Sequence, residues 1–598
     1  MSSPVPAVST FSQRSVHART LGRMVLDATG RHTGTVARFW RDGEVVEWSY
    51  ADFGLAVRET ATGLVDLGLR PGDRLALLAG TRAEWTLVDC AALCAGATVV
   101  PLYATSSPEE CGFALRHAQA RFVVVEDAAQ LAKVLKIRDT CPELEHILAI
   151  EPADGALALD EVRGKADDAA LEAIQLGIGA DALATIVYTS GTTGSPKGCM
   201  LTHANLLATM DMYEVRVTET DPMVLFMFLP LSHALARIAQ LLTIDVGGTL
   251  AFWRGDATRL LDDVAEAAPT HLPSVPRLFE KIHTRAKGGV DDAGGLKQHL
   301  FGWALDVGAR ARASERAGAG TDPWLRAQHL VADRVVLAKV RALFGERLRL
   351  AVTGAAPISH DVLRFFDACG VLLLEGYGMS ETCAAATLNT DAAFRFGTVG
   401  RALPGTEVRI AADGEVLLRG PNVMTGYYRN PEATQETFDG DWLRTGDLGV
   451  LDPDGYLSIT GRKKDLIITS SGQNVSPADI EAALRESRWI SEAVIYGDDH
   501  PYLVGVVTLD PEETGALAHE LELDHDAEAM AHDQRVHDRI ELDVRAANKR
   551  FSRITQVKRF AILDHDLTLA GGELTPTLKI KRAVVYDHYR DVFEGLYV

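Results

Sequence analysis

The chain has 598 residues, and this length predicts two or more domains because a single hydrophobic core stops growing at a smaller size. Its 60 lysines and arginines stand against 82 aspartates and glutamates, so the formal net charge is −22, which argues against a nucleic-acid-binding protein. The 7 cysteines are scattered, odd in number and without a C-x-x-C pair, so a disulfide-stabilised secreted domain is disfavoured.

No segment of the sequence is typical of an exported or membrane-inserted protein. The N-terminal run MSSPVPAVSTFSQRSVHART lacks the apolar stretch of a secretion signal. No uninterrupted apolar run approaches the ~20 residues that a membrane-spanning helix needs. We therefore expect a cytoplasmic protein whose contact with a membrane is at most peripheral, at the inner face. The oligomeric state is left open.

Strand-like and helix-like segments alternate along the first two thirds of the chain. Between about residues 50 and 150, the β-prone runs RLALLAG, ATVVPLY, RFVVVED and HILAI alternate with amphipathic helical runs. A second series, from about residue 182 to 390, has expected strands near TIVYTS, VLFMFLP, GTLAFW, LRLAVTG and VLLLEG. Such alternation predicts an α/β fold built on parallel sheets.

Three further regions depart from this pattern. Residues 281–345 are helical and rich in Arg, Ala and Gly, and we expect them to elaborate the second sheet. Between residues 396 and 471, AADGEVLLRG and LDPDGYLSIT each place Asp-Gly between β-prone runs, which predicts hairpins. After about residue 464, the helical run ADIEAALRES and the strands EAVIYG and LVGVVTL predict a small α+β domain.

The segment YTSGTTGSPKG, residues 188–198, has the composition of a phosphate-binding loop. Its glycines let the backbone approach an anion closely, and its hydroxyls and lysine suit phosphate oxygens. It is not a Walker A loop, because Pro196 precedes Lys197 and no hydroxyl follows the lysine. On its own, the segment would be interpreted more simply as a flexible polar loop.

Six further motifs follow this loop, and the whole set resembles the adenylate-forming superfamily of acyl-CoA synthetases, peptide-synthetase adenylation domains and luciferases. The resemblance implies a large N-terminal domain, residues 1–463, with two α/β subdomains and a β-barrel-like subdomain. A small mobile α+β domain, residues 464–598, would follow it. The motifs are LPLSH (229–233), VTGAAP (352–357), EGYGMSET (375–382), RTGDLG (444–449), GRKKDLIITSSGQNVSP (461–477) and LTPTLKIKR (574–582).

The resemblance also implies a reaction in two halves. A carboxylate and ATP first give an acyl-adenylate and pyrophosphate, and a thiol then displaces AMP to give a thioester. ATP, Mg²⁺ and coenzyme A are the implied cofactors.

The implied nucleotide site draws on most of these motifs. Glu381 and Thr192 would hold Mg²⁺, since this hard cation prefers oxygen donors and bridges phosphates. Tyr377 would face adenine, and Asp447 would accept hydrogen bonds from both ribose hydroxyls. Taken singly, Tyr377 would be interpreted as a core residue and Asp447 as a turn former. The implied ATP-binding residues are Thr189, Ser190, Gly191, Thr192, Thr193, Gly194, Lys197, Gly354, Ala355, Gly376, Tyr377, Ser380, Asp447 and Arg462.

Four more residues receive roles from the resemblance. Lys579 matches the family's lysine near the C-terminus, and its ammonium would stabilise charge at the α-phosphate during attack. His233 would border the carboxylate and pyrophosphate. Lys464 occupies the hinge position, and Gly472 would let the pantetheine arm of coenzyme A pass close to the backbone.

Three features resemble long-chain fatty acyl-CoA synthetases: the form EGYGMSET, the helical insertion, and THLPSVPRLFEKI at residues 270–282. The form TLKIKR in place of the Thr-Gly-Lys common elsewhere disfavours acetate or an aryl acid as substrate. We therefore expect a fatty acid, ATP and coenzyme A as partners, and no nucleic acid.

Two alternatives remain open. The first is a fatty acyl-AMP ligase that supplies a carrier protein; no appended carrier domain is visible, which favours coenzyme A. The second is a nucleotide-binding regulator without catalysis. The presence of Lys197, Glu381, Asp447 and Lys579 disfavours it.

Overall fold

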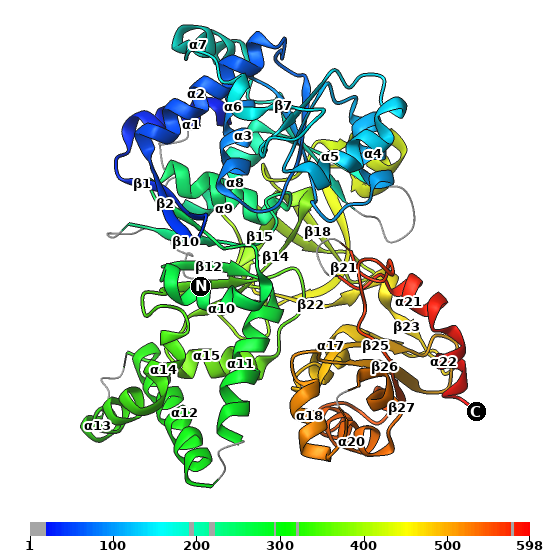
Figure 1. The fold of residues 1–598 in the computed structure, drawn as a ribbon. Coiled ribbons are helices and arrows are strands. Elements are labelled where there is room, and N and C mark those ends of the chain that lie inside the picture. Colours follow the sequence, from blue (N-terminus) through cyan, green and yellow to red (C-terminus); the bar gives the residue numbers. More distant parts are fainter. Residues whose placement is uncertain are drawn as a thin grey trace, which may run out of the picture.

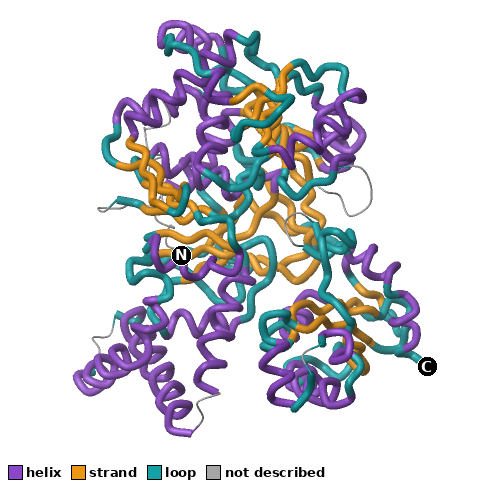
Figure 2. The backbone as a smooth tube through the Cα atoms, viewed as in Figure 1, coloured by secondary structure: helices purple, strands orange, loops and turns teal. Residues whose placement is uncertain are grey.

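The computed structural model of the chain describes residues 20–189, 196–214, 222–291, 295–318, 322–524, 526–575 and 579–598. Figure 1 shows a large body that contains the first two thirds of the chain and a smaller C-terminal unit beside its lower part. In Figure 2 the strands lie at the centre of each part, with helices around them.

The first sheet has eight strands in the order β19-β9-β8-β4-β3-β5-β6-β7 and lies in the upper part of Figure 1. Its core strands β4, β3, β5 and β6 are parallel neighbours, as the sequence predicts. The strands are β3 (Arg74–Leu78), β4 (Thr98–Leu102), β5 (Phe122–Val125), β6 (His146–Ala149), β7 (Leu157–Ala158), β8 (Leu183–Thr189), β9 (Lys197–Thr202) and β19 (Gly426–Tyr427).

One strand prediction assigns the wrong sheet. The strand near TIVYTS, β8, was expected to begin the second sheet, but it pairs in parallel with β4 and antiparallel with β9 of the first sheet. Thr189, at the end of β8, lies opposite Lys197, at the start of β9. Residues 190–195 therefore connect two antiparallel neighbours. Alternating composition identifies a strand but does not identify its pairing partner.

The second sheet has nine strands in the order β16-β15-β14-β13-β12-β10-β11-β1-β2. The run from β11 to β14 is parallel, so the carboxyl ends of these strands meet at one edge. The strands are β1 (Thr35–Arg41), β2 (Glu44–Ser49), β10 (Val224–Met227), β11 (Thr249–Phe252), β12 (His271–Ser274), β13 (Leu350–Thr353), β14 (Leu373–Met379), β15 (Ala384–Leu388) and β16 (Arg401–Ala402).

Helices cover both sheets, and local signals set several of their ends. In α4, for example, Ser107 and Glu110 form a capping box and Pro108 occupies the first turn. The helices are α1 (Leu21–Arg31), α2 (Tyr50–Asp66), α3 (Ala83–Cys94), α4 (Pro108–Ala118), α5 (Ala128–Ile137), α6 (Leu159–Val162), α7 (Asp168–Gly177), α8 (His203–Glu214), α9 (Ala234–Asp245), α10 (Leu260–Ala267), α15 (His360–Ala368) and α16 (Pro431–Thr437).

The predicted hairpins are confirmed in a five-stranded antiparallel sheet. Asp413-Gly414 connects β17 to β18, and Asp454-Gly455 connects β21 to β22, with both glycines at positive φ. The strands are β17 (Glu407–Ile410), β18 (Glu415–Arg419), β20 (Phe438–Asp439), β21 (Trp442–Leu451) and β22 (Leu457–Arg462).

The helical insertion projects from the large body at the lower left of Figure 1. We call α11 to α14 the helical extension: α11 (Pro276–Asp291), α12 (Gly295–Arg316), α13 (Pro323–Ala332), a π-helical turn (Asp333–Leu337) and α14 (Ala338–Ala342). Its inner face is apolar and shares a core with the second sheet and α15.

The C-terminal unit has its own core around the three-stranded sheet β25-β26-β27. The α+β composition predicted for it is confirmed. Its elements are β23 (Ile467–Ile468), β24 (Asn474–Val475), α17 (Pro477–Leu484), β25 (Ile490–Tyr496), β26 (Leu503–Leu509), α18 (Thr514–Leu521), α19 (Ala527–Ala531), α20 (Gln534–Asn548), β27 (Val557–Ile562), α21 (Arg582–His588) and α22 (Arg590–Gly595).

Two sequence expectations about the chemistry of the chain can be compared with this fold. The 7 cysteines are all free and buried. Across the described ranges, none of the helices is both long enough and apolar enough to cross a bilayer.

Candidate active site

At the predicted adenine site, two neighbouring strands of the second sheet lie so close together that no side chain fits between them. Gly354 directly follows β13, and a Cβ there would lie 2.9 Å from the carbonyl oxygen of Gly376 on β14. The next residue, Ala355, has φ +70°, a conformation that an alanine adopts only where its surroundings hold it. These residues lie at the carboxyl edge of the parallel strands, where α/β sheets bind ligands.

Buried Asp447 is the centre of a three-residue network beside this edge. It lies on β21, opposite Arg462 on β22, whose Nε donates to Asp447 Oδ1 at 2.7 Å. The Tyr377 hydroxyl donates to Asp447 Oδ2 at 2.6 Å. Burial, and then the charge of Asp447, raise the pKa of Tyr377 well above its ordinary value, so this phenol remains a donor. Each carboxylate oxygen keeps a second lone pair for a ligand hydroxyl.

Glu381 and Lys197 lie on either side of a tyrosine, where the two sheets meet. Glu381 is in the 3₁₀ turn Ser380–Thr382 that follows β14, and the Tyr427 hydroxyl donates to its Oε1 at 2.7 Å. The Lys197 ammonium lies 5.1 Å from the centre of the Tyr427 ring. A carboxylate and an ammonium group in this arrangement suit a cation and the phosphate oxygens that it neutralises.

His233 caps the N-terminus of α9 and is neutral at pH 7. Burial, and then the positive charge of Lys579, lower the pKa of His233 to about 4. Its Nδ1 accepts the backbone N–H of Leu235 at 3.3 Å, so its single proton is on Nε2.

Lys579 reaches this region from the C-terminal unit. Its N–H donates to Thr575 Oγ1 at 3.0 Å, and its carbonyl accepts the N–H of Thr575 at 2.8 Å. Part of the residue is open to solvent, yet the protein atoms around its ammonium lower its pKa, as does the charge of Arg462. Asp447 and Glu381 act on the same pKa in the opposite direction. These charges influence one another because the C-terminal unit holds Lys579 near the nucleotide residues.

Only part of the predicted phosphate loop lies within the described residues. Residues 190–194, which hold five of the predicted ATP ligands and the metal ligand Thr192, lie outside the described residues. The flanking residue Thr189 donates its hydroxyl to the carbonyl of Lys197 at 3.4 Å. On the facing turn, the Ser380 carbonyl accepts the Cys199 thiol at 3.5 Å, which connects the Glu381 turn to β9.

Lys464 and Gly472 lie in two exposed turns that follow Arg462 along the chain. Lys464 is exposed in a 3₁₀ turn directly after β22, while its neighbour Lys463 is anchored by two carboxylates at 2.6 and 2.8 Å. Gly472 has φ +78° in the turn between β23 and β24, with open space where a Cβ would lie. In the described part of the chain, no hydrogen bond or ion pair connects Gly472 to the nucleotide residues.

The side chains present fit a Mg²⁺ ion shared with phosphate, not one bound by protein alone. Among the residues that the structure describes, no three His, Cys, Asp or Glu side chains gather as a metal site. Mg²⁺ in nucleotide sites is bound through one or two carboxylates and substrate phosphates, and Glu381 beside Lys197 supplies such a carboxylate.

Two residues near the site were missed from the sequence. Tyr427 belongs to none of the sequence motifs, and only its hydrogen bond to Glu381 identifies it as a residue of the site. Glu375 on β14 begins the motif EGYGMSET, but no role is predicted for it from the sequence. It is half-buried, and desolvation raises the pKa of its carboxyl to about 8, so it is neutral at pH 7. The role of a single Tyr or Glu cannot be predicted from the sequence, because it depends on contacts with residues that are distant along the chain.

Two family models match the chain. The model described as AMP-binding enzyme matches residues 26–428, and the model described as AMP-binding enzyme C-terminal domain matches residues 464–598.

Curated relatives cover almost the whole chain. It is 37% identical to the long-chain-fatty-acid–CoA ligase FadD15 of Mycobacterium tuberculosis, over 93% of this chain and 93% of that protein. It is 32% identical to the long-chain-fatty-acid–CoA ligase ACSBG1 of Homo sapiens, over 97% of this chain and 85% of that protein.

Solved structures share the fold. The A domain of carboxylic acid reductase from Segniliparus rugosus, in complex with AMP and a co-purified carboxylic acid, has a TM-score of 0.77 and 20% identity, over 98% of this chain and 95% of that one. The anthranilate CoA ligase AuaEII in complex with anthranoyl-AMP has a TM-score of 0.74 and 20% identity, over 97% and 99%. These likenesses confirm the predicted α/β architecture.

Proposed function

Because the chain belongs to the family of AMP-binding enzymes, we propose that it is a long-chain fatty acid–CoA ligase. It would activate a fatty acid with ATP to acyl-AMP and pyrophosphate, and then transfer the acyl group to coenzyme A with release of AMP. The observation that carries the proposal is the hydrogen-bond network of Tyr377, Asp447 and Arg462 beside the edge of the second sheet. The charges of Arg462, Asp447 and Glu381 in the large body act on the pKa of Lys579, which belongs to the C-terminal unit. The names of the relatives support the long-chain acid and the coenzyme A acceptor.

In the adenylation step, the large body binds and orients ATP. Tyr377 faces adenine, the close approach at Gly354 and Gly376 leaves space for the base, and Asp447 accepts the ribose hydroxyls. Lys197 and the loop at residues 190–194 bind the phosphates. Mg²⁺ held by Glu381 and Thr192 would neutralise phosphate charge.

Lys579 acts where the new bond forms. A carboxylate oxygen of the fatty acid attacks the α-phosphorus, the bond to the bridging oxygen breaks, and pyrophosphate leaves with the electron pair. The Lys579 ammonium stabilises the negative charge on the attacked phosphate. Neutral His233 donates its Nε2–H to the acid or to the departing pyrophosphate.

The thioester step needs a different arrangement of the same unit. The thiol of coenzyme A attacks the acyl carbon and AMP leaves, and Gly472 would line the path of the pantetheine arm. Lys579 and Gly472 both belong to residues 464–598, and each is needed in only one of the two steps. We propose that this domain rotates relative to residues 1–463 about the exposed Lys464, a hinge motion in which a few residues absorb the change.

Substrate length tests the proposed function directly. Palmitate is expected to exceed acetate and benzoate in kcat/KM by at least about 10³-fold, because each buried CH₂ is worth about 0.8 kcal/mol. The measurement is AMP release with coenzyme A across straight-chain acids of increasing length. Acetate equal to palmitate contradicts the long-chain assignment. Product analysis with coenzyme A and with an acyl carrier protein separates the ligase from the alternative acyl-AMP ligase.

A peripheral membrane contact through the helical extension is also part of the proposal. Residues 276–342, from the start of α11 to the end of α14, hold 12 Lys and Arg against 7 Asp and Glu, in a chain whose net charge is −22. On α13, Trp324 and Val331 are seven residues apart, on one helix face, and are 69% and 54% exposed. Apolar side chains on a basic surface suit an anionic bilayer, which would also supply the fatty acid.

The double variant Trp324→Ala, Val331→Ser is expected to lower binding to phosphatidylglycerol-containing vesicles at least about fivefold, because its apolar contacts with the lipid are lost. Co-sedimentation measures the binding. The matched control is Leu176→Ser, since Leu176 is 72% exposed on α7, far along the chain from the extension. Unchanged binding in the double variant, or equal binding to neutral vesicles, contradicts the proposed contact.

A further inference from the structure

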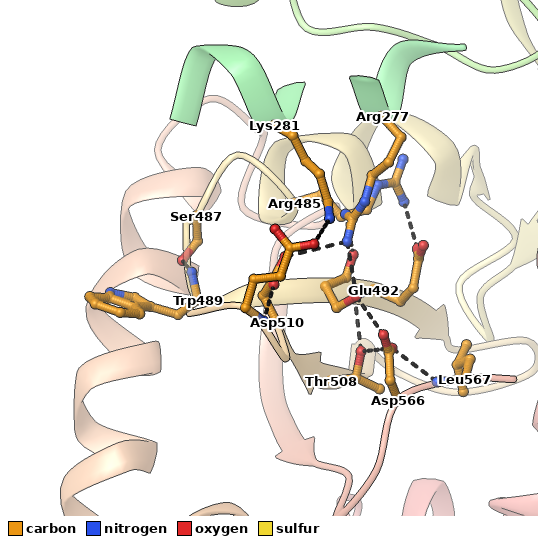
Figure 3. Close-up of polar contacts among 12 residues, drawn as sticks. Arg277, Lys281, Arg485, Ser487, Trp489, Glu492, Thr508, Asp510, Asp566 and Leu567 are labelled. Atoms are coloured by element: carbon orange, nitrogen blue, oxygen red, sulfur yellow. Dashed lines mark hydrogen bonds and ion pairs between the residues drawn. The ribbon is translucent and has the colours of Figure 1, made fainter. Parts of the chain in front are cut away.

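The C-terminal unit docks on α11 through two basic side chains (Figure 3). Arg277 Nη1 donates to the Ser491 carbonyl at 2.6 Å, and Nη2 donates to the Ser491 hydroxyl at 2.9 Å. Arg277 Nη2 also lies 3.5 Å from Asp510 Oδ2. One turn further along α11, Lys281 Nζ lies 2.6 Å from Glu512 Oε1. The arginine thus holds one residue of the other unit through two hydrogen bonds, which specify orientation as well as distance.

Ser491 connects Arg277, through hydrogen bonds, to the segment that contains Lys579. Its hydroxyl donates to Asp566 Oδ2 at 2.7 Å. The other oxygen, Asp566 Oδ1, accepts the Thr508 hydroxyl at 2.6 Å and the N–H of Leu567 at 2.9 Å. Asp566 begins the stretch after β27 that leads to Lys579. A continuous set of hydrogen bonds therefore runs from α11 to the start of the lysine segment, as Figure 3 shows.

The contact between α11 and the C-terminal unit also buries two carboxyl groups, whose ionised forms a nearby cation stabilises. Glu280 on α11 and Glu492 on β25 both have raised pKa values, because burial disfavours their charged forms. The charges of Arg485 and Arg277 act against this rise at both carboxyls. Loss of Arg277 removes one of the two cations that favour the ionised forms of Glu280 and Glu492, and this loss destabilises the docked arrangement.

We propose that Arg277 is a positioning residue for adenylate formation: through Ser491 and Asp566 it holds the C-terminal unit in the orientation that presents Lys579 to the nucleotide. The inference rests on the proposed function, and in particular on rotation about Lys464. That rotation separates α11 from Ser491, Asp510 and Glu512 together, so the Arg277 contact belongs to the first half-reaction and breaks before the second.

The test compares the two half-reactions in Arg277→Ala. Palmitate-dependent ATP–pyrophosphate exchange is expected to fall about tenfold or more, while conversion of supplied palmitoyl-AMP and coenzyme A to palmitoyl-CoA changes less than about twofold. Arg38→Ala is the control, since the Arg38 side chain on β1 is 41% exposed and pairs with Glu47 on the adjacent strand β2 at 2.8 Å. It should leave both half-reactions unchanged. Equal losses in both half-reactions, or normal exchange in Arg277→Ala, overturn the inference.

Swapping the charges of the second pair, Lys281 and Glu512, gives a test that does not depend on whether the Arg277 variant folds. Lys281 and Glu512 are 40% and 69% exposed, so both tolerate substitution. Lys281→Glu should lower ATP–pyrophosphate exchange but not thioester formation. The double variant Lys281→Glu with Glu512→Lys should restore ATP–pyrophosphate exchange. A double variant no better than the single one overturns the inference. Absence of palmitate-dependent exchange in the unaltered protein instead refutes the proposed function.

Discussion

Lys579→Ala is expected to lower adenylate formation by about 10²–10³-fold while leaving thioester formation from supplied acyl-AMP and coenzyme A close to normal. The ammonium stabilises charge at the α-phosphate only in the first half-reaction, and groups of this kind contribute about that factor. ATP–pyrophosphate exchange measures the first half-reaction, and palmitoyl-CoA formation from palmitoyl-AMP measures the second. Lys581→Ala, two residues away, is the control and should retain exchange.

Lys464→Pro is expected to give the opposite lesion, with exchange largely kept and thioester formation lost. Proline fixes φ near −65° and removes an N–H, which restricts rotation at this exposed turn. Lys464→Ala removes the same side chain but keeps the backbone free, and it should retain both half-reactions. Equal losses of both half-reactions in the Lys579 and Lys464→Pro variants contradict domain rotation.

Candidate nucleotide residues could be named from the sequence because their motifs resemble those of a known family. Their mutual contacts could not. The Tyr377–Asp447 hydrogen bond spans 70 positions and the Tyr427–Glu381 bond spans 46. Which distant side chains meet depends on the order of strands in the sheets, and periodicity does not encode that order.

The same reason explains the error at β8. The run TIVYTS is correctly predicted as a strand because it is β-prone and apolar. Its sheet is decided by pairing with β4, whose residue Val99 lies opposite Thr185. Likewise, Arg277 lies four residues before the stretch that is expected to be helical from the sequence, and its partner Ser491 is 214 positions away in another unit.

Glu381→Ala is expected to lower Mg²⁺-dependent pyrophosphate release by about 10³-fold. Phosphate charge would be left without its metal, and a metal ion contributes several kcal/mol at such a centre, at about 1.4 kcal/mol per tenfold in rate. The variant also leaves the Tyr427 hydroxyl without its acceptor, which costs about 1–3 kcal/mol of stability, so the protein should remain folded. Pyrophosphate release measured over a Mg²⁺ titration, with the melting temperature as a check on folding, gives the result.

Two variants separate the metal role of Glu381 from a structural one. Tyr427→Phe removes the hydroxyl that donates to Glu381 but keeps the carboxylate, so Mg²⁺-dependent release should fall only about tenfold or less. Glu407→Ala removes an exposed carboxylate that pairs with Arg419 on the hairpin sheet, and it should leave release unchanged. If Glu381→Ala retains near-normal release with an unchanged Mg²⁺ dependence, the carboxylate does not hold the metal. The loop at residues 190–194 would then have to supply its protein ligands, beginning with Thr192.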